Sequence, residues 1–354
     1  MEKITGLVLL IIGAGVFLYL LPFFAPVFGF NVDNFSGTAD SSVSGQIFIL
    51  NNGSSENETA VWHSSLMPDI FEIQNSPYNN SVLYAATSRG IFISRDNGKN
   101  WYAWSDLERK IDGASVYKIV FDKSFFGRAF IAAFKNNRGY VYETEDNLFS
   151  LNQIFDVQNE RVYAIEFFHN NQPGNGQNIL IGLSDGRILS YSPETKEFRP
   201  FAHFESDIYG IKAANSHLYI TTKSNGIFVR AGGSDKFESL ASGDILGQSL
   251  KSVAVEEKTG SPLYAASLAD AFSSFNQGFS WNGIQTVLAS RDSIDSIFLS
   301  PLKELYLASG IKLYRSRDNG QSWQMYFSLD EKSKRKISAV YFGENGKIII
   351  GTKE

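Results

Sequence analysis

Two stretches of the chain carry a serine, an aspartate, a glycine and a tryptophan at identical spacing. "SRDNGKNW" runs from Ser94 to Trp101, and "SRDNGQSW" runs from Ser316 to Trp323, 222 residues further on. A carboxylate in such a loop could bind calcium, but the alternating acidic ligands of an EF-hand loop are missing. The same carboxylate can instead accept hydrogen bonds from backbone N–H groups in a tight turn. We therefore predict that both octets are structural.

In this interpretation the aspartate fixes the turn, the glycine adopts positive φ, and the tryptophan buries its indole against a neighbouring sheet. The residues predicted to act in this way are Ser94, Asp96, Gly98, Trp101, Ser316, Asp318, Gly320 and Trp323. Two incomplete copies of the octet, "TEDNLFSL" from Thr144 and "SFNQGFSW" from Ser274, lie between them. Gradual loss of the pattern is expected of a repeated structural turn and not of a catalytic site.

Other residues that could perform catalysis do not form a recognised constellation. "GLSDG", from Gly182 to Gly186, matches the G-x-S-x-G motif around Ser184, but that motif needs a strand–turn–helix setting, and here a hairpin is expected. Cysteine is absent, which excludes disulfides, thiolate chemistry and cysteine-ligated zinc. The histidines show no i, i+4 pairing or other metal-ligand spacing, and they are His63, His169, His203 and His217. We predict no metal site and no cofactor.

A repeat of 42 to 46 residues positions all of these groups, since each unit opens with an apolar strand. The seven opening strands are "DIFEI" at Asp69, "SVYKIVF" at Ser115, "RVYAIEFF" at Arg161, "DIYGIKA" at Asp207, "SLKSVAV" at Ser249, "SIDSIFLSP" at Ser293 and "KISAVYF" at Lys336. In the first six units a second strand turns through a short hairpin, in most units a glycine-containing one, into a third, as in "LYAATSRGIFIS". In four of these units an octet or an incomplete copy follows. This spacing is typical of propeller blades.

The seventh unit stops after two strands, "KISAVYF" and "GKIIIGTKE". Its outer strands are predicted to come from "GQIFILNN" and "TAVWHS" in the segment from Gly45 to Ser64. Joining the two ends of the chain in one blade would close the ring and leave no open sheet edge. The fold predicted is all-β, a seven-bladed β-propeller with four-stranded blades.

Both octets, in register with this repeat, resemble those of the Asp-box, or BNR-repeat, β-propellers. That family includes sialidases, xyloglucanases, the sortilin ectodomain and photosystem II assembly factors. The resemblance covers residues 43–354, and it implies that the octets lie between the third and fourth strands, on the face away from the family's active sites. It supports architecture more than activity.

The amino-terminal residues 1–30 differ from the rest, because the segment from Ile4 to Phe30 contains no charged residue. That length can span a bilayer as a hydrophobic helix, so we expect an uncleaved transmembrane anchor with the propeller outside the cytoplasm. The alternative is a cleaved signal and a secreted protein. Residues 31–42 read as a polar stalk. The net charge of −5, with both signs interspersed, argues against a nucleic-acid partner.

Loops between second and third strands gather on one rim of a propeller. The rim residues predicted to bind a partner are Arg89, Arg138, Asp185, Lys223 and Asp270. The run "DEKSKRK" from Asp330 to Lys336 belongs to the same rim and is expected to be a solvated loop. By resemblance to sortilin and the assembly factors, we expect a non-catalytic, membrane-tethered scaffold for a protein or peptide.

The alternative function is a glycoside hydrolase of sialidase-like or xyloglucanase-like type. Such an enzyme needs two carboxylates across a cleft, and Asp112, Asp185 and Asp270 are the candidates. The Arg-Ile-Pro element that the resemblance to sialidases would require does not occur in this sequence.

Overall fold

The computed structural model describes residues 47–51, 58–64, 68–169, 177–240, 250–288 and 292–354. The chain divides into two units, Met1–Ser41 and Ser42–Glu354, and all described residues belong to the second. The predicted anchor (1–30) and stalk (31–42) lie outside the described residues. Within the ranges above, no helix has the length and apolar character needed to cross a membrane.

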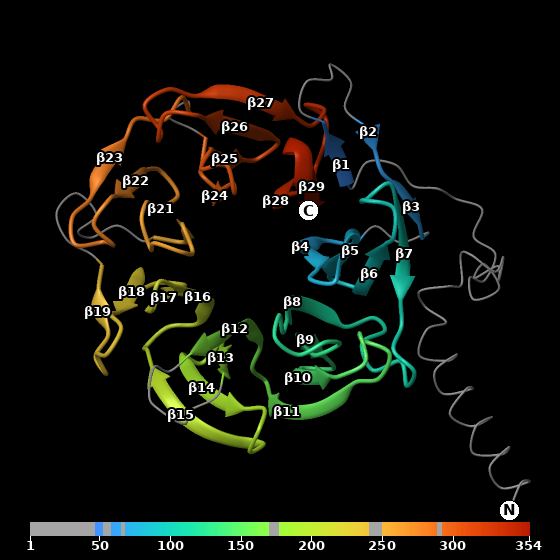
Figure 1. Ribbon diagram of the computed structural model, residues 1–354. Coiled ribbons are helices and arrows are strands. Elements are labelled where there is room, and N and C mark those ends of the chain that lie inside the picture. The colour runs from blue at the N-terminus through green and yellow to red at the C-terminus, as the bar shows by residue number, and fades with distance from the viewer. Residues whose placement is uncertain (1–46, 52–57, 65–67, 170–176, 241–249, 289–291) are drawn as a thin grey trace, which may run out of the picture. The chain divides into compact units, whose positions relative to one another are not determined.

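The described strands form seven sheets, in which consecutive strands pair antiparallel. We call these sheets blades 1 to 7 in chain order (Figure 1). Blade 1 contains β4 (Ile70–Ser76), β5 (Asn79–Thr87), β6 (Gly90–Ser94) and β7 (Asn100–Trp104); blade 2 contains β8 (Ser115–Phe121), β9 (Ala129–Lys135), β10 (Arg138–Thr144) and β11 (Asn152–Gln158). Blade 3 contains β12 (Val162–His169), β13 (Gln177–Leu183), β14 (Arg187–Ser192) and β15 (Glu197–His203). The predicted seven-bladed propeller with four-stranded blades is confirmed.

The remaining blades follow the same order of strands. Blade 4 contains β16 (Ile208–Ala214), β17 (His217–Thr222), β18 (Ile227–Arg230) and β19 (Glu238–Ser239); blade 5 contains β20 (Ser252–Val255), β21 (Leu263–Ala266), β22 (Ala271–Ser274) and β23 (Asn282–Ile284). Blade 6 contains β24 (Ser296–Leu299), β25 (Leu305–Ser309), β26 (Lys312–Ser316) and β27 (Gln324–Ser328). Blade 7 combines β28 (Lys336–Phe342) and β29 (Ile348–Lys353) with β1 (Ile47–Leu50) and β2 (Glu58–Thr59).

The N-terminal segment departs from the prediction in one respect. The strand in "GQIFILNN" does pair with β29, but only Glu58–Thr59 extends blade 7 as β2. The next residues form β3 (Val61–His63), which pairs in parallel with β7 and becomes a fifth strand of blade 1. Of "TAVWHS", only Thr59 pairs within blade 7, and the rest of the segment does not extend that blade. The physical reason is Trp62, whose ring stacks on Phe92 of blade 1 at 4.2 Å.

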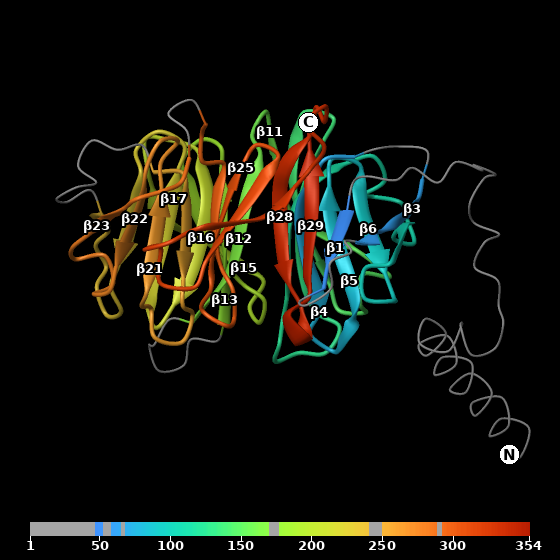
Figure 2. The same ribbon diagram turned by 90° about the horizontal axis from the view of Figure 1, so that it is seen from above.

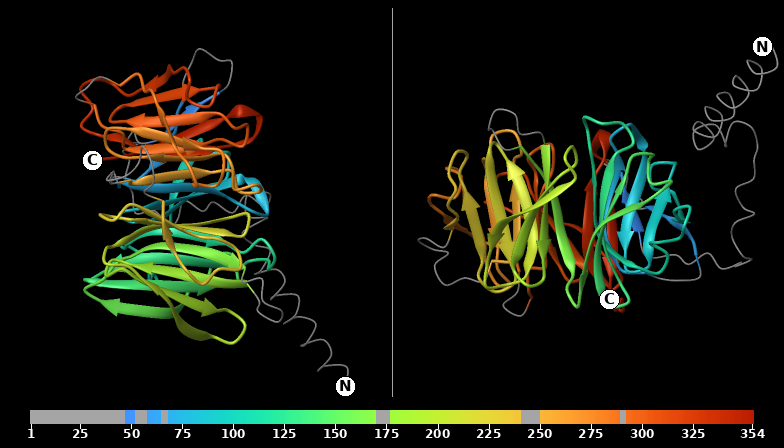
Figure 3. Two further views of the ribbon diagram at one scale, coloured as in Figure 1. Left: turned by 90° about the vertical axis from the view of Figure 1, so that its left-hand side faces the viewer. Right: turned by 90° about the horizontal axis from the view of Figure 1, so that it is seen from below.

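Apolar residues from adjoining blades pack together and form the core. Ile91 of blade 1 and Ile131 of blade 2 belong to one buried cluster, and equivalent clusters join the other blades. Full burial of a side chain of this size contributes about 1.5–3 kcal/mol. Because strands connect as antiparallel neighbours, successive loops alternate between the two ends of the ring (Figures 2 and 3).

These two ends can be named from their loops. The hairpin face carries the turns between second and third strands and the connections from one blade to the next. The octet face carries the turns between first and second strands and the octets between third and fourth strands. Figure 1 is viewed along the axis of the ring. The first strands of the blades lie nearest this axis, as labelled for β4, β8, β12, β16, β24 and β28.

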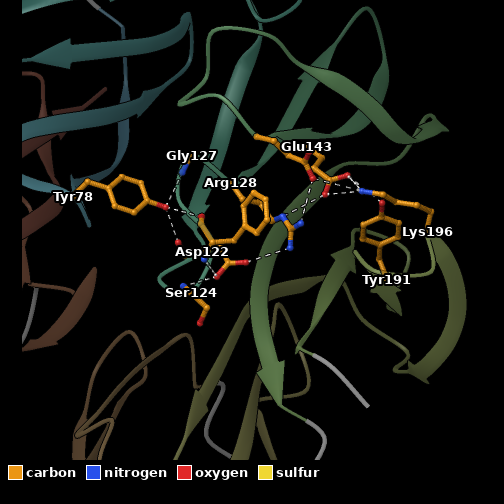
Figure 4. Close-up of polar contacts among 10 residues, drawn as sticks. Tyr78, Asp122, Ser124, Gly127, Arg128, Glu143, Tyr191 and Lys196 are labelled. Carbon is orange, nitrogen blue, oxygen red and sulfur yellow. Dashed lines mark hydrogen bonds and ion pairs between the residues drawn. The ribbon is translucent and has the colours of Figure 1, made fainter. Parts of the chain in front are cut away.

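A buried ionic cluster joins blades 1, 2 and 3 on the octet face (Figure 4). Arg128 lies between Asp122, at 3.6 Å, and Glu143, at 3.9 Å, and both acidic residues are at most 4% exposed. Lys196 of blade 3 donates to Glu143 at 3.0 Å. From blade 1, the Tyr78 hydroxyl donates to the backbone carbonyl of Asp122 at 2.8 Å. The cluster thus ties three successive blades together.

Candidate binding face

The octets adopt one turn geometry. In the first, Ser94 Oγ donates to Asp96 Oδ1 at 2.8 Å, and the Gly98 N–H donates back to Ser94 Oγ at 2.8 Å. In the second, the same two hydrogen bonds measure 2.7 and 2.8 Å and join Ser316, Asp318 and Gly320. The incomplete copies reproduce them with Thr144 and Ser274 as the hydroxyl residues. A structural role for the octets stays a prediction, and this geometry supports it.

Two features of the first octet favour glycine at position 98, although Leu148 adopts a similar positive φ, +72°, in the copy from Thr144. Gly98 has φ of +86°, and a Cβ there would lie 2.7 Å from Ile349 Cδ1 of blade 7. Trp101, which is fully buried, packs into the same interface, and its indole N–H donates to the Gly98 carbonyl at 2.8 Å. Each octet therefore packs against the preceding blade. Trp323 is only half-buried, so the two tryptophans are not equivalent.

On the hairpin face, four aromatic side chains form an arc around the axis. Each follows the first apolar residue of one of four consecutive opening strands, and the arc consists of Phe71, Tyr117, Tyr163 and Tyr209. Their successive ring centroids lie 5.2, 5.0 and 5.2 Å apart. A register shift at this position in each strand marks a β-bulge, which changes the direction of the side chain. We call this set the aromatic arc.

The corresponding positions of the other three blades are polar. They are Lys251, Asp295 and Ser338. Beside the arc, Arg161 donates to the Tyr163 hydroxyl at 3.4 Å. Burial raises the pKa of Tyr117 and of Tyr209, so both phenols stay neutral and can donate hydrogen bonds near pH 7. The face therefore offers aromatic rings on one side of the axis and polar groups on the other.

Each of the four strands that carry the aromatic arc also has a charged residue shortly after its aromatic residue. Lys118 pairs with Glu72, and Lys212 pairs with Glu257 at 2.6 Å. Burial raises the pKa of Glu166. Burial alone would lower the pKa of Lys212, but the Glu166 and Glu257 carboxylates outweigh it and raise that pKa. These groups form a mixed-charge layer behind the aromatic arc.

Four of the five predicted rim residues lie in turns between second and third strands, and Arg138 is the first residue of β10 directly after such a turn. All five are therefore on the hairpin face, but they are spread over five blades. Lys223 lies beside the arc, since it pairs with Asp207 at 3.5 Å and contributes to the electrostatic environment of Tyr209. Arg138 pairs with Asp156 of β11, at the outer edge of blade 2. Arg89 and Asp270 occupy exposed turns of blades 1 and 5. The rim residues do not form one cluster.

The candidate catalytic carboxylates are also dispersed. Asp112 pairs with Arg109 at 3.7 Å, and Asp185 pairs with Arg187 at 2.6 Å. Ser184 lies in a strand-to-strand turn and donates to Glu160 at 2.5 Å, a setting that differs from a nucleophile elbow. Among the residues that the structure describes, no three His, Cys, Asp or Glu side chains gather as metal ligands.

The basic run from Asp330 to Lys336 is not wholly solvated, so that expectation is wrong for its last two residues. Arg335 is 10% exposed and pairs with Asp69 of blade 1 at 3.2 Å, while also donating to the Pro68 carbonyl at 3.0 Å. Lys336 pairs with Asp295 at 3.2 Å. The run therefore helps to join blades 6, 7 and 1.

No family model and no curated protein sequence matches this chain. Among solved structures, YCF48 from Cyanidioschyzon merolae is similar at 13% identity, with a TM-score of 0.61 over 81% of this chain and 97% of that chain. A structure of YCF48 bound to D1 peptide aligns at 13% identity, with a TM-score of 0.59 over 90% of this chain and 100% of that chain. The GH74 xyloglucanase from Xanthomonas campestris aligns at 13% identity and a TM-score of 0.61, over 80% of this chain but only 51% of the enzyme. These likenesses show the propeller fold, while membership of the Asp-box family stays a prediction.

Proposed function

We propose that this propeller is a scaffold that holds a protein or peptide partner on its hairpin face. The observation that carries the proposal is the aromatic arc, because four consecutive blades place an aromatic ring at the same position beside the axis. Large aromatic side chains supply much of the energy of protein interfaces. A structure of similar fold, YCF48, has been solved bound to D1 peptide, which supports a peptide as the class of ligand.

The arrangement suits a partner with both apolar and charged side chains. Apolar side chains would pack on the aromatic arc, where Tyr209 is 40% exposed. Arg161, Lys223 and Lys251 would orient acidic groups of the partner, since each is exposed on the same face. Backbone groups of the partner could bond to the neutral phenols of the arc.

Membrane tethering through residues 1–30 is part of the proposal. Its support is the uncharged segment from Ile4 to Phe30. Protein recovered from membranes should retain an amino terminus near Met1 and resist alkaline carbonate extraction. A mature terminus between Gly29 and Gly45 would show a cleaved signal instead.

Site-specific photo-crosslinking in the native host tests the scaffold. A benzoylphenylalanine replaces Tyr209 in the full-length protein, and captured proteins are identified by mass spectrometry. The matched control places the same residue at Tyr102 of blade 1, which is also 40% exposed but lies on an outer strand. We expect a distinct crosslinked partner from position 209 only.

Capture must also depend on the arc itself. Tyr117→Ala with Tyr163→Ala should abolish the crosslink from position 209 while leaving the unfolding midpoint within the range of surface variants. Equal capture from positions 209 and 102, or capture that survives the double substitution, would exclude the arc as the binding site. Glycoside turnover that is lost in Asp185→Asn would instead favour the hydrolase alternative.

A further inference from the structure

A groove on the octet face lies at the junction of blades 6, 7 and 1. Its volume is about 570 Å³, which is the size of small-molecule sites in proteins. The lining comes from the hairpins β24–β25, β28–β29 and β4–β5, with Arg315 and Tyr326 from the outer strands of blade 6. A second groove of about 380 Å³ shares the β28–β29 hairpin and continues to Asn97 and Lys99 of the first octet.

Side-chain hydrogen bonds hold the residues of the lining in place. The Tyr306 hydroxyl donates to Glu304 Oε2 at 2.7 Å, and Arg317 donates to Glu304 Oε1 at 2.7 Å. On the opposite side, Asn75 Nδ2 donates to Asn80 Oδ1 at 3.1 Å, and Asn80 in turn donates to Glu344 at 2.6 Å. Ligand groups would therefore meet polar atoms that are already oriented.

Two cations of the lining lie within the electrostatic influence of carboxylates, Arg315 near Glu304 and Lys347 near Glu58, but form no close ion pair with them. The guanidinium of Arg315 lies over the Tyr326 ring at 4.4 Å, and Lys347 donates to the Asn97 backbone carbonyl at 2.6 Å. Neither forms an ion pair with another residue that the structure describes. Glu304 is already paired with Arg317, so Glu344 is the remaining carboxylate of the lining. Burial lowers the pKa of Lys347, and a nearby anion would offset that burial.

We propose that this groove binds an anionic saccharide, a sugar whose ring carries a carboxylate. Arg315 presents a planar fork that matches a carboxylate, and its stacking on Tyr326 orients that fork. The half-buried ring of Tyr341 supplies an apolar surface for a sugar ring. The site lies on the other face from the aromatic arc and involves a different class of ligand, so it is independent of the proposed scaffold function.

The hydrogen-bonding groups favour a sugar over an acidic peptide. Asn75, Asn80 and Glu344 alternate amide donors with carbonyl and carboxylate acceptors along one wall. Sugar hydroxyls both donate and accept, and can satisfy such a wall in full.

Isothermal titration calorimetry of the full-length protein tests the site. Digalacturonic acid is the probe, cellobiose is the neutral disaccharide control, and triglutamate is the acidic peptide control. We expect saturable one-to-one binding of digalacturonic acid and at least about tenfold weaker binding of both controls, which corresponds to about 1.4 kcal/mol. Arg315→Ala should weaken the binding of digalacturonic acid by at least about tenfold.

Arg199→Ala is the matched control, since Arg199 is 77% exposed in β15 of blade 3 and should leave binding unchanged. If Arg315→Ala does not fold, Lys347→Gln replaces it and should weaken binding by at least about threefold, or about 0.65 kcal/mol. The proposal is overturned by absent saturation with digalacturonic acid, by comparable affinity for cellobiose or triglutamate, or by unchanged binding in the folded groove variant.

Discussion

Trp62 and Trp101 lie with their ring centroids 6.1 Å apart and their planes inclined by 28°. Trp62 belongs to β3, in the N-terminal segment, whereas Trp101 closes the first octet in β7, and the two residues are partners in a parallel pairing. Both side chains are at most 1% exposed. Because β1 pairs with β29 of blade 7, the N-terminal segment is attached to two neighbouring blades.

This contact predicts a coupled loss of stability. Trp62→Ala and Trp101→Ala should each lower the free energy of unfolding by about 3–5 kcal/mol, since each leaves a large buried cavity. The double variant should lose about 0.5–1.5 kcal/mol less than the sum of the two, because the ring contact is removed only once. Urea unfolding of the full-length protein measures the cycle. Additivity within experimental error would show that the rings do not interact.

The second octet should be less sensitive than the first. Trp323 is half-buried, and its indole N–H has no acceptor among the described residues, whereas Trp101 is fully buried and bonded to the Gly98 carbonyl. Trp323→Ala should therefore cost at least about 1 kcal/mol less than Trp101→Ala. The same unfolding experiment compares them. Equal stabilities of the two variants, or loss of binding without loss of stability, would contradict a purely structural role.

The fold could be predicted from the sequence because an apolar opening strand recurs in all seven units. Seven opening strands at regular spacing, with hairpins and octets in register, specify the number and order of blades. The placement of β3 did not follow. "TAVWHS" reads as a strand, but whether Trp62 packs beside Phe92 or extends blade 7 depends on tertiary packing, which the local pattern does not encode.

The aromatic arc was present in the sequence but was not recognised as a site. In four units the residue after the first apolar residue is aromatic, and these residues are Phe71, Tyr117, Tyr163 and Tyr209. Aligning the repeats on their first apolar residue would have revealed this pattern. Rim charges were chosen by loop position, and loop position alone does not tell a clustered residue from a dispersed one. The sequence pattern predicted Arg335 to be a solvated loop residue. Its partner Asp69 lies far away in the sequence, so the local pattern could not indicate the ion pair.

The free energy of unfolding should depend on pH through the ionisation of Asp318. Hydrogen bonds from Ser322 and Ser316 lower the pKa of Asp318 to about 2, below its ordinary value of 3.8. A carboxyl whose pKa is lowered by folding stabilises the native state above its unfolded pKa, and that contribution is lost as pH falls from about 4 toward 2. Wild type should therefore lose more stability than Asp318→Asn over this interval. Urea midpoints measured between pH 5 and pH 2.5 give the difference.

The octet from Ser274 provides a natural reference for that variant. Asn276 occupies the aspartate position there, accepts from Ser274 Oγ at 2.9 Å and accepts from the Ser280 N–H at 2.9 Å. Asp318→Asn should accordingly fold with the turn intact at neutral pH. Parallel pH profiles of wild type and Asp318→Asn would show that the hydrogen bonds at Asp318 do not stabilise its ionised form.

Arg128 should be the most costly charge to remove from the octet face. Arg128→Met leaves the buried Asp122 without its cation, while Glu143 retains Lys196, so the expected loss is about 3–5 kcal/mol of unfolding free energy. The control Arg199→Met breaks an exposed pair with Glu197 and should change stability by less than about 0.5 kcal/mol. Adding Asp122→Asn to Arg128→Met should restore at least about 1 kcal/mol, since an amide can still accept from the Ser124 N–H without a buried charge. If Arg128→Met unfolds at the same urea concentration as the control, the cluster does not hold the three blades together.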